Sequence, residues 1–393
     1  MSADTKDNDL TVQTRDSGRG PSLQPPPVIT DPDNEYGSNM RRFQGIPSVE
    51  VTKKGRLWAL WYAGGADEPG EGPGNYQVAI TSDDDGYSWS NPKVVIDPPG
   101  DVRAFDGMLW CDPLGRLWLF WAQSQGTYDG RAGVWYIRTD DPDRETVSWT
   151  EPKRIANGIA LNKPTVLSNG EWLLPIGVWI RKPGNNTPAP YRFYLEEEIG
   201  AAVWVSTDHG ESWSLRGRAQ VPDRSFDEHM VVERQDGSLW MLVRTQYGIG
   251  ESVSTDMGKT WSAGRPSGIP HVCSRFFIRR LASGKILLVR HNPPPSSVSA
   301  KPGGVRSHLT AYLSDDDGAS WYGGLLLDER VRVSYPDGVQ TPDGKIYIIY
   351  DYDRQGERQI CMAVFTEADV AAGKIVSSEG RLRVLVDQAT YEG

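Results

Sequence analysis

SDDDGYSW, at residues 82–89, is the stretch that decides how this chain folds. The same pattern, S-x-D-x-G-x-x-W, returns as STDHGESW (206–213), STDMGKTW (254–261) and SDDDGASW (314–321). Each copy follows a short run with β-strand character. Its Asp can accept hydrogen bonds from nearby backbone N–H groups and its Gly can adopt a positive φ, which together favour a tight turn between strands. Four copies indicate a repeated structural unit.

Outward from these boxes, the chain alternates apolar runs with turns and shows little helical periodicity. The first unit contains GIPSVEV (45–51), RLWALWYAG (56–64) and NYQVAITS (75–82), and five similar units follow. A degenerate box, RTDDPDRETVSW (138–149), fills the long gap between the first two complete copies. Such units predict an all-β fold, a six-bladed β-propeller of four-stranded blades with Asp-box turns.

We expect a flexible polar tail over residues 1–38 and the propeller over residues 39–393. Within the propeller, TEADVAAGK (366–374) is expected to form one short helix. The run RLRVLVDQ (381–388) is expected to form an outer strand.

The composition narrows the possible partners. The chain has 393 residues and a net charge of −10, which argues against nucleic acid or an anionic membrane as the main partner. No run is apolar enough to span a membrane. The three cysteines and five histidines show no metal-ligand spacing, and no glycine-rich phosphate loop is present, so we expect no metal and no cofactor. The N-terminus shows no signal peptide, which leaves a cytoplasmic protein or a mature secreted form, and the oligomeric state stays open.

Charged residues at the starts of inner strands are the natural candidates for a functional site, because these starts converge on the axis of a propeller. Glu228 opens the fourth unit and Arg244 follows its first turn. Arg306 lies in the fifth unit and Tyr335 opens the sixth. The sequence therefore predicts that these four side chains share one central pocket.

The boxes, together with this ordered set, resemble the sialidase (neuraminidase) superfamily over roughly residues 41–370. The resemblance implies that Tyr335 is the nucleophile and Glu228 the base that activates it. It also implies that Arg244 and Arg306 belong to an arginine triad that binds a substrate carboxylate. A guanidinium suits a carboxylate, and a neutral tyrosine avoids the repulsion that an anionic nucleophile would meet there.

The chain departs from the family at two places. The family's F-R-I-P motif carries the first arginine of the triad, but here the stretch is FQGIP and Gly45 stands where that arginine would be. Arg42, or Arg41 beside it, and Gln44 are the candidates to replace it. The family's general acid lies in a loop before the first box, and here that loop offers Glu71 as first choice and Asp67 as second.

Further polar residues lie where the same rim is expected and are predicted to contact the substrate. They come from blades two to five: Arg103, Asp106, Lys163 with its neighbour Asn162, His229, Arg275 and His291.

Together these features favour a retaining exo-glycoside hydrolase of sialidase type. It would remove a terminal acidic sugar, a sialic acid or a related ulosonic or uronic acid, from a glycan. A polysaccharide lyase or another glycosidase acting on uronate-containing glycans is an alternative, with Tyr335 and either His229 or His291 as the lyase pair. A third alternative, motivated by the missing arginine, is a carbohydrate-binding propeller without catalysis.

Overall fold

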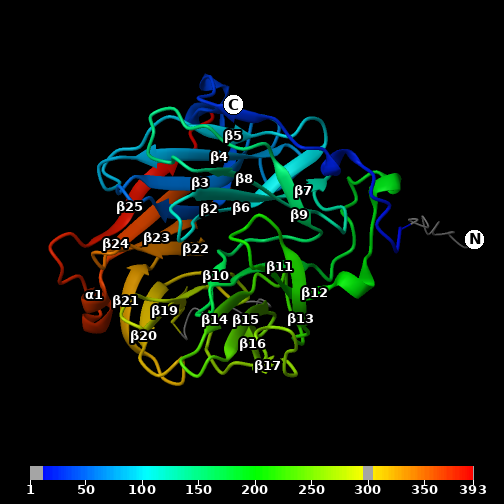
Figure 1. The fold of residues 1–393 in the computed structure, drawn as a ribbon. Helices are drawn as coiled ribbons and strands as arrows, with labels where there is room; N and C mark the ends of the chain where they lie inside the picture. The colour runs from blue at the N-terminus through cyan, green and yellow to red at the C-terminus, as the bar shows by residue number, and fades with distance from the viewer. Residues whose placement is uncertain (1–11, 295–303, 393) are drawn as a thin grey trace, which may run out of the picture.

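Six antiparallel sheets surround one axis in the computed structural model, which describes residues 12–294 and 304–392 (Figure 1). The predicted all-β, six-bladed propeller is confirmed. The first strand of each blade lies nearest the axis and the last lies outermost. The blades follow one another along the chain, so the colours of the ribbon run once around the ring.

The strands of the blades have the following bounds. Blade one contains β2 (Phe43–Val51), β3 (Leu57–Gly64), β4 (Asn75–Ser82) and β5 (Val94–Ile96), with β1 (Val28–Thr30) at its outer edge. Blade two contains β6 (Val102–Cys111), β7 (Leu117–Gln125), β8 (Val134–Thr139) and β9 (Lys153–Ala156). Blade three contains β10 (Thr165–Val166), β11 (Trp172–Val178), β12 (Gly200–Ser206) and β13 (Ser214–Ala219).

The other half of the ring has the same plan. Blade four contains β14 (Met230–Glu233), β15 (Leu239–Thr245), β16 (Gly248–Ser254) and β17 (Arg265–Pro266). Blade five contains β18 (Phe277–Arg280), β19 (Ile286–His291), β20 (Leu309–Ser314) and β21 (Tyr322–Asp328). Blade six contains β22 (Val333–Gln340), β23 (Ile346–Tyr352), β24 (Gln359–Phe365) and β25 (Arg381–Gln388). The expected outer strand at residues 381–388 is therefore confirmed.

The four Asp boxes make the same hydrogen bonds at the turn between the third and fourth strands of their blades. In the first box, Ser82 Oγ donates to Asp84 Oδ1 over 2.8 Å and accepts from the Gly86 N–H over 2.9 Å. Asp84 also accepts from the Ser88 N–H and hydroxyl, which lower the pKa of Asp84 to about 2 and keep it charged. Gly86 has the expected positive φ, 79°. The same bonds recur at Ser206, Asp208, Gly210 and Ser212, at Ser254, Asp256, Gly258 and Thr260, and at Ser314, Asp316, Gly318 and Ser320.

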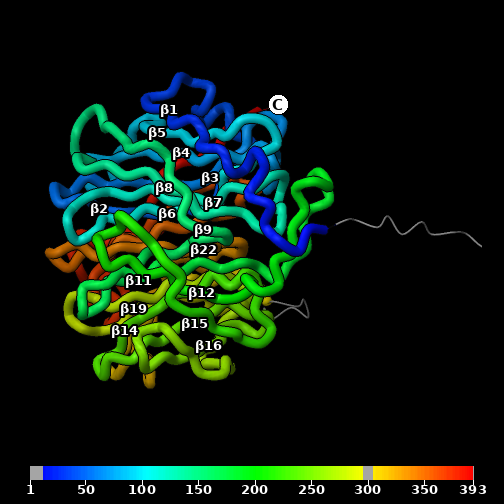
Figure 2. Tube along the Cα trace, turned by 45° about the vertical axis from the view of Figure 1, so that its right-hand side comes forward, coloured from blue at the N-terminus to red at the C-terminus, as the bar shows by residue number. Residues whose placement is uncertain are grey.

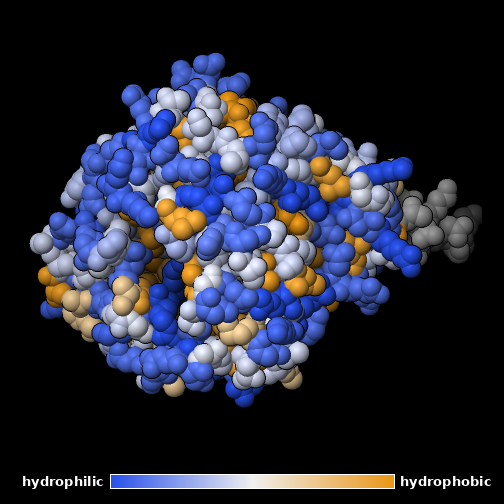
Figure 3. All heavy atoms as spheres, viewed as in Figure 1, coloured by the Kyte–Doolittle hydropathy of each residue, from blue (hydrophilic) through white to orange (hydrophobic). Residues whose placement is uncertain are grey.

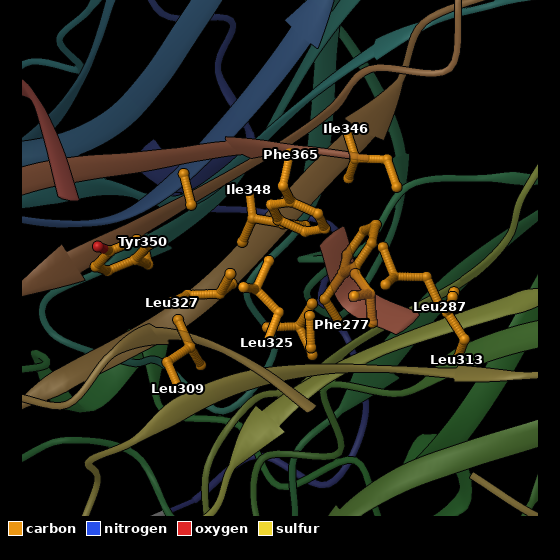
Figure 4. Packing of buried hydrophobic residues seen from close by; sticks show 14 of the residues in the cluster. Phe277, Leu287, Leu309, Leu313, Leu325, Leu327, Ile346, Ile348, Tyr350 and Phe365 are labelled. Atoms are coloured by element: carbon orange, nitrogen blue, oxygen red, sulfur yellow. The ribbon is translucent and has the colours of Figure 1, made fainter. Parts of the chain in front are cut away.

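Hydrophobic side chains fill the spaces between neighbouring blades. Between blades five and six, Phe277, Leu309 and Leu325 pack against Ile348 and Phe365, all at most 4% exposed (Figure 4). Burying each such side chain contributes about 1.5–3 kcal/mol. Similar clusters join the other neighbouring blades, so the ring is held mainly by apolar contact between blade faces.

The ring closes between blades one and six through side chains, because within the described residues every sheet takes its inner four strands from a single blade segment. Val49 and Trp61 share a buried cluster with Ile349 and Met362. At the outer end, Asp85 of the first box accepts hydrogen bonds from blade-six side chains, including Arg381 over 2.9 Å. The last described residues lie beside blade one in Figure 1.

Short helical segments occur outside the sheets. The expected helix is confirmed as α1 (Glu367–Ala372), which begins with a capping box between Thr366 and Asp369. Within residues 12–294 and 304–392, 3-10 turns lie at Pro21–Leu23, Asn34–Tyr36, Ser38–Met40, Ala189–Tyr191 and Glu196–Glu198. Among the described residues, no helix has the length and apolar character needed to cross a membrane.

The residues from 12 onward run along the outside of the ring, as the blue tube in Figure 2 shows. Gln123 of β7 donates hydrogen bonds to the backbone oxygens of Ser22 and Gln24, both over 2.9 Å. Arg131, which is fully buried, forms an ion pair with Asp16. This N-terminal segment therefore covers the side of blade two.

Candidate active site

Three inner strands carry a β-bulge near their start. The bulges interrupt the register of β2, β6 and β22, and each contains a residue with positive φ. These residues are Ile46 at 57°, Asp106 at 47° and Tyr335 at 56°. A bulge redirects a side chain that a regular strand would send into a blade face. Ile46 and Tyr335 accordingly meet in one buried cluster.

Glu228 lies on a strained turn just before β14. Phe226, Asp227 and Glu228 have φ values of 62°, 52° and 45°, in a region where each residue other than Gly costs about 1–3 kcal/mol. Two hydrogen bonds hold the turn. Asn162 Nδ2 donates to the backbone oxygen of Glu228 over 2.9 Å, and the Arg244 N–H donates to the backbone oxygen of Asp227 over 2.9 Å. The turn thus positions Glu228, whose carboxylate contacts Arg244 and Tyr335.

Tyr335, Glu228 and Arg244 form a closed hydrogen-bonded group. Tyr335 Oη donates to Glu228 Oε1 over 3.1 Å, and Arg244 Nη1 lies 2.7 Å from the same Oε1 and 3.1 Å from Tyr335 Oη. All three residues are buried. Burial and the negative charge of Glu228 raise the pKa of Tyr335 to about 12 despite the nearby arginines. The phenol therefore keeps its proton near neutral pH, and Glu228 is placed to accept that proton.

Two further guanidinium groups flank the ring of Tyr335. The Cζ atom of Arg306 lies 5.3 Å from the ring centre, and that of Arg354 lies 5.0 Å from it. Arg306 was predicted from the sequence. Arg354, in the turn after β23, was missed. The structure thus brings Tyr335, Glu228, Arg244 and Arg306 together and adds Arg354 to them.

A cavity of about 530 Å³ opens beside this group. Its lining is mostly polar and includes three arginines: Phe43, Glu71, Gly304, Arg306, Val331, Arg332, Ser334, Asp353, Arg354 and Gln355. Arg306 and Arg354, which lie over the ring of Tyr335, both line this cavity, as does Ser334, the neighbour of Tyr335 in the chain. The face of the protein seen in Figure 3 is mostly hydrophilic, with hydrophobic residues in small, scattered groups.

The loop predicted to supply the general acid carries two candidate carboxylates, Glu71 and Asp67, and the structure pairs Glu71 with arginines and exposes Asp67. Glu71, whose side chain is 45% exposed, lies 2.8 Å from Arg354 and 3.6 Å from Arg103. Burial acts to raise the pKa of Glu71, but these two cations outweigh it and lower the pKa below its usual value. Asp67 is exposed in the same loop. A carboxylate paired with two arginines holds its charge and is a poor proton donor.

Asp106 has the opposite environment. It is only 5% exposed at the bulge of β6. Burial, with the charges of Glu71 and Glu228, raises its pKa to about 7 against the effect of Arg103 and Arg354. Phe105, in the same bulge of β6, shares a buried cluster with Tyr335, so the bulge that carries Asp106 lies beside the Tyr335 site. A carboxyl that titrates near neutrality is suited to donate a proton.

Two predicted substrate-binding residues lie deeper on the axis, in a group that we call the axial cluster: Lys163, Glu50, Asp337 and Arg275. Lys163 Nζ lies 3.2 Å from Glu50 and 3.2 Å from Asp337, and Arg275 Nη2 lies 3.2 Å from the other oxygen of Asp337. All four side chains are at most 5% exposed. The structure therefore places Lys163 and Arg275 in contact with protein carboxylates.

The candidates to replace the missing arginine contact other parts of the protein. Gln44 is fully buried and bonded to Arg41 and Asp387 at the junction of blades one and six. Arg42 is exposed and donates to the backbone oxygen of Ala66 over 3.2 Å. Neither is brought to Tyr335.

The histidines of the lyase alternative are bonded to backbone oxygens. His229 Nε2 lies 2.6 Å from the oxygen of Ala202, and burial lowers the pKa of His229 to about 4. His291 Nε2 lies 2.8 Å from the oxygen of Val333, and burial lowers its pKa to about 3. Both rings are therefore neutral near pH 7. Over residues 12–294 and 304–392, no group of His, Cys, Asp and Glu has the arrangement of a metal site.

Comparisons with known proteins agree with this architecture. The model of the BNR repeat-like domain family matches residues 12–348. No curated protein sequence matches the chain. Among solved structures, the intramolecular trans-sialidase from Ruminococcus gnavus, in complex with oseltamivir carboxylate, is similar with a TM-score of 0.62 and 14% identity, over 88% of this chain and 98% of that one.

Two other solved structures show how widely this fold is used. A protein of unknown function from Dyadobacter fermentans has a TM-score of 0.61 and 18% identity, over 85% of this chain and 95% of that one. The α-L-arabinanase from Penicillium chrysogenum, complexed with arabinobiose, has a TM-score of 0.55 and 13% identity, over 88% of this chain and all of that one. At these identities the similarity concerns the fold.

Proposed function

Because this chain belongs to the BNR repeat-like domain family and has the propeller of the sialidase superfamily, we propose that it is a retaining exo-glycoside hydrolase that removes a terminal acidic sugar from a glycan. The sugar is a sialic acid or a related ulosonic or uronic acid. One observation carries the proposal. Tyr335 donates its phenolic hydrogen to Glu228 over 3.1 Å while Arg244 contacts both oxygens. This is the arrangement that a tyrosine nucleophile with its own base requires.

The first half of the reaction forms a bond between Tyr335 Oη and the anomeric carbon. The phenol has a pKa of about 12, so it attacks while its proton passes to Glu228. Arg244 stabilises the negative charge that develops on the phenolic oxygen. At the same time the bond from the anomeric carbon to the leaving oxygen breaks, and that oxygen takes a proton from Asp106.

The second half restores the enzyme. Water attacks the anomeric carbon and gives a proton to Asp106, while Tyr335 Oη leaves and regains its proton from Glu228. Two displacements at one carbon retain the anomeric configuration. The environments of Asp106 and Glu71 favour Asp106 as the proton donor, because Asp106 has the raised pKa and Glu71 is paired with two cations.

Among the acidic sugars proposed, sialic and other ulosonic acids carry the carboxylate on the reacting carbon itself, and such a sugar fits the charges around Tyr335. Arg306 donates to the backbone oxygen of Cys273 over 3.4 Å and has no carboxylate partner in the part of the chain that the structure describes. Its remaining donors suit a carboxylate. The similar R. gnavus protein was solved with a carboxylate ligand, which supports this choice of substrate class.

A panel of fluorogenic glycosides tests the proposal. It should contain sialic, ulosonic and uronic acids together with neutral sugars such as arabinose. We expect release of the acidic sugars only, and NMR during turnover should show the product first in the anomeric configuration of the substrate. Release of neutral sugars, or an inverted product, would contradict the proposal. An unsaturated uronate product would indicate the lyase alternative, and binding without release would indicate a carbohydrate-binding propeller.

The role of Asp106 predicts how activity depends on pH. Asp106 is protonated below its pKa of about 7 and loses its proton above it. The wild-type kcat/KM should therefore fall about tenfold per pH unit above pH 7. Asp106→Asn should lower kcat/KM by about 10²- to 10⁴-fold for a poor leaving group and remove this alkaline decline. For a substrate whose leaving group departs without a proton, Asp106→Asn should lower kcat/KM much less.

Glu71→Gln is the matched control for this prediction. It changes the other candidate acid and should leave the alkaline decline in place. If Glu71→Gln removes the decline and Asp106→Asn keeps it, then Glu71 is the acid.

A further inference from the structure

The side chain of Arg354 occupies the space that a side chain at position 45 would need. A Cβ atom added to Gly45 would lie 2.1 Å from Cδ and 2.5 Å from Cγ of Arg354. Real Cβ contacts are never this short, so any other residue at position 45 would displace the arginine stem. Gly45 has no positive φ, so its backbone does not require glycine. The absence of a side chain at position 45 is therefore what admits Arg354.

The stem of Arg354 enters the site beside two of the bulges. Asp351 lies 3.7 Å from Arg354 Nε and also accepts hydrogen bonds from the Ile46 N–H over 2.9 Å and from Ser334 Oγ over 2.6 Å. The same fully buried carboxylate thus joins the bulge of β2, the bulge of β22 and the arginine. This anchorage places the guanidinium 5.0 Å from the ring of Tyr335.

The three arginines around Tyr335 differ in whether a protein carboxylate already pairs with them. Arg244 is paired with the buried carboxylate of Glu228 over 2.7 Å. Arg306 has no carboxylate partner in the described segments. Arg354 is paired with Glu71, whose side chain is 45% exposed and lies on a surface loop. The contact with Glu71 shows that the guanidinium of Arg354 is placed to bind a carboxylate. Because Glu71 is exposed, a substrate carboxylate can displace it more easily than it could displace the buried Glu228 from Arg244.

We propose that Arg354 is the residue that selects substrates with a carboxylate at the reacting carbon, binding it together with Arg306, and that Gly45 is required for this because it admits Arg354 to the site. This proposal rests on the proposed function, since it concerns the same site. It assigns the carboxylate-binding guanidinium beside Arg306 to blade six, whereas position 45 in blade one has no side chain. Arg354 is thus a specificity-determining residue, and Asp351 is the residue that positions it.

The test compares two probes that differ only at the carboxylate: oseltamivir carboxylate and its ethyl ester, in which that group carries no charge. Dissociation constants are measured by calorimetry, so no turnover is needed. Wild type should prefer the carboxylate. Arg354→Gln should reduce this preference about 10- to 100-fold, the usual range for a lost hydrogen bond to a charged group. Arg354→Lys, which keeps the charge without the planar fork, should give an intermediate preference.

Variants of glycine separate the role of Gly45 from a general effect on folding. Gly45→Ala should reduce the preference as Arg354→Gln does, because the added Cβ displaces Arg354. Gly65→Ala is the control, since a Cβ there meets nothing within 4 Å, and it should keep the wild-type preference. The double variant Gly45→Arg with Arg354→Gly returns a guanidinium from the other strand and should recover part of the preference.

Several outcomes would overturn the inference. One is a wild type that binds the two probes equally or binds neither. Another is an Arg354→Gln variant that keeps the full preference while its melting temperature matches wild type. Loss of preference in Gly65→Ala equal to that in Gly45→Ala would also count against it. These results are independent of turnover, so failure here is distinguishable from failure of the proposed hydrolysis.

Discussion

Tyr335→Phe is expected to lower kcat by about three orders of magnitude or more on the acidic sugar that wild type releases. The variant lacks the oxygen that would bond to the anomeric carbon, and the remaining groups can only bind and polarise the substrate. Affinity for a carboxylate ligand should change little, because Arg306 and Arg354 contact the face of the ring and do not depend on its hydroxyl. Initial rates and calorimetry on the same preparation measure both effects.

Tyr350→Phe provides the matched control for this variant. Tyr350 lies in the same blade, is fully buried, and donates its hydroxyl to a buried carboxylate, Asp328, over 3.0 Å. Its loss should lower stability without lowering kcat. Mass spectrometry of wild type quenched during turnover should also find the sugar bonded to the peptide that contains Tyr335. Retention of full activity by Tyr335→Phe would exclude the proposed mechanism.

The fold could be predicted because its repeated turn is a local structure. Within one box, Ser82, Asp84, Gly86 and Ser88 bond to one another within seven residues, so the pattern is visible in the sequence itself. The apolar runs before and after each box then set the strands. The boxes and the apolar runs are local, so they mark each blade without information about its neighbours. Because the blades follow one another along the chain, this was enough to predict their order.

The core of the candidate site could also be predicted, since Tyr335, Glu228, Arg244 and Arg306 come from positions that converge in any propeller. Their contacts agree with that expectation, and their catalytic roles are the proposal made above. Arg354 was not predicted, because the contact that places it lies across the junction of blades one and six. The sequence does contain a signal for it, a glycine at position 45 where the family has a side chain.

The pKa values and ion-pair partners of the predicted general acid and rim residues could not be predicted from the sequence. Glu71 and Asp106 are both carboxylates near the site, and only burial and the position of Arg354 separate their pKa values. Lys163 and Arg275 lie near the axis as expected, but their partners, Glu50 and Asp337, come from other blades. Which charges neutralise one another depends on packing between blades, and that packing has no local pattern.

The axial cluster explains how a ring of separate blades can hold a site at its centre. Asp337 of blade six forms an ion pair with Lys163, which lies just before blade three. It also accepts hydrogen bonds from Arg275 of the segment before blade five and from Ser48 Oγ of blade one. Arg275 Nε also donates to Asn162, which in turn holds the backbone of the Glu228 turn. The charges that join the blades are thus connected to the strained turn that positions the proposed base.

Asp337→Asn is therefore expected to destabilise the protein by about 3–5 kcal/mol, the usual result of removing one partner from a buried ion pair. The side chain keeps its shape, so the change isolates the charge. Lys163 and Arg275 would each lose a carboxylate at a site that is at most 3% exposed. The free energy of unfolding, measured by urea denaturation of wild type and variant, gives the effect.

Glu329→Gln is the surface control for this measurement. It removes the charge from a shorter ion pair, 2.7 Å from Arg383, whose side chains are 51% and 49% exposed. Solvent screens such a pair, and the change should cost at most about 1 kcal/mol. If Asp337→Asn costs no more than Glu329→Gln, the axial cluster does not hold the blades together. If Asp337→Asn is strongly destabilising, the axial cluster stabilises the contacts between blades. The same cluster then also supports the turn that positions Glu228, through Arg275 and Asn162.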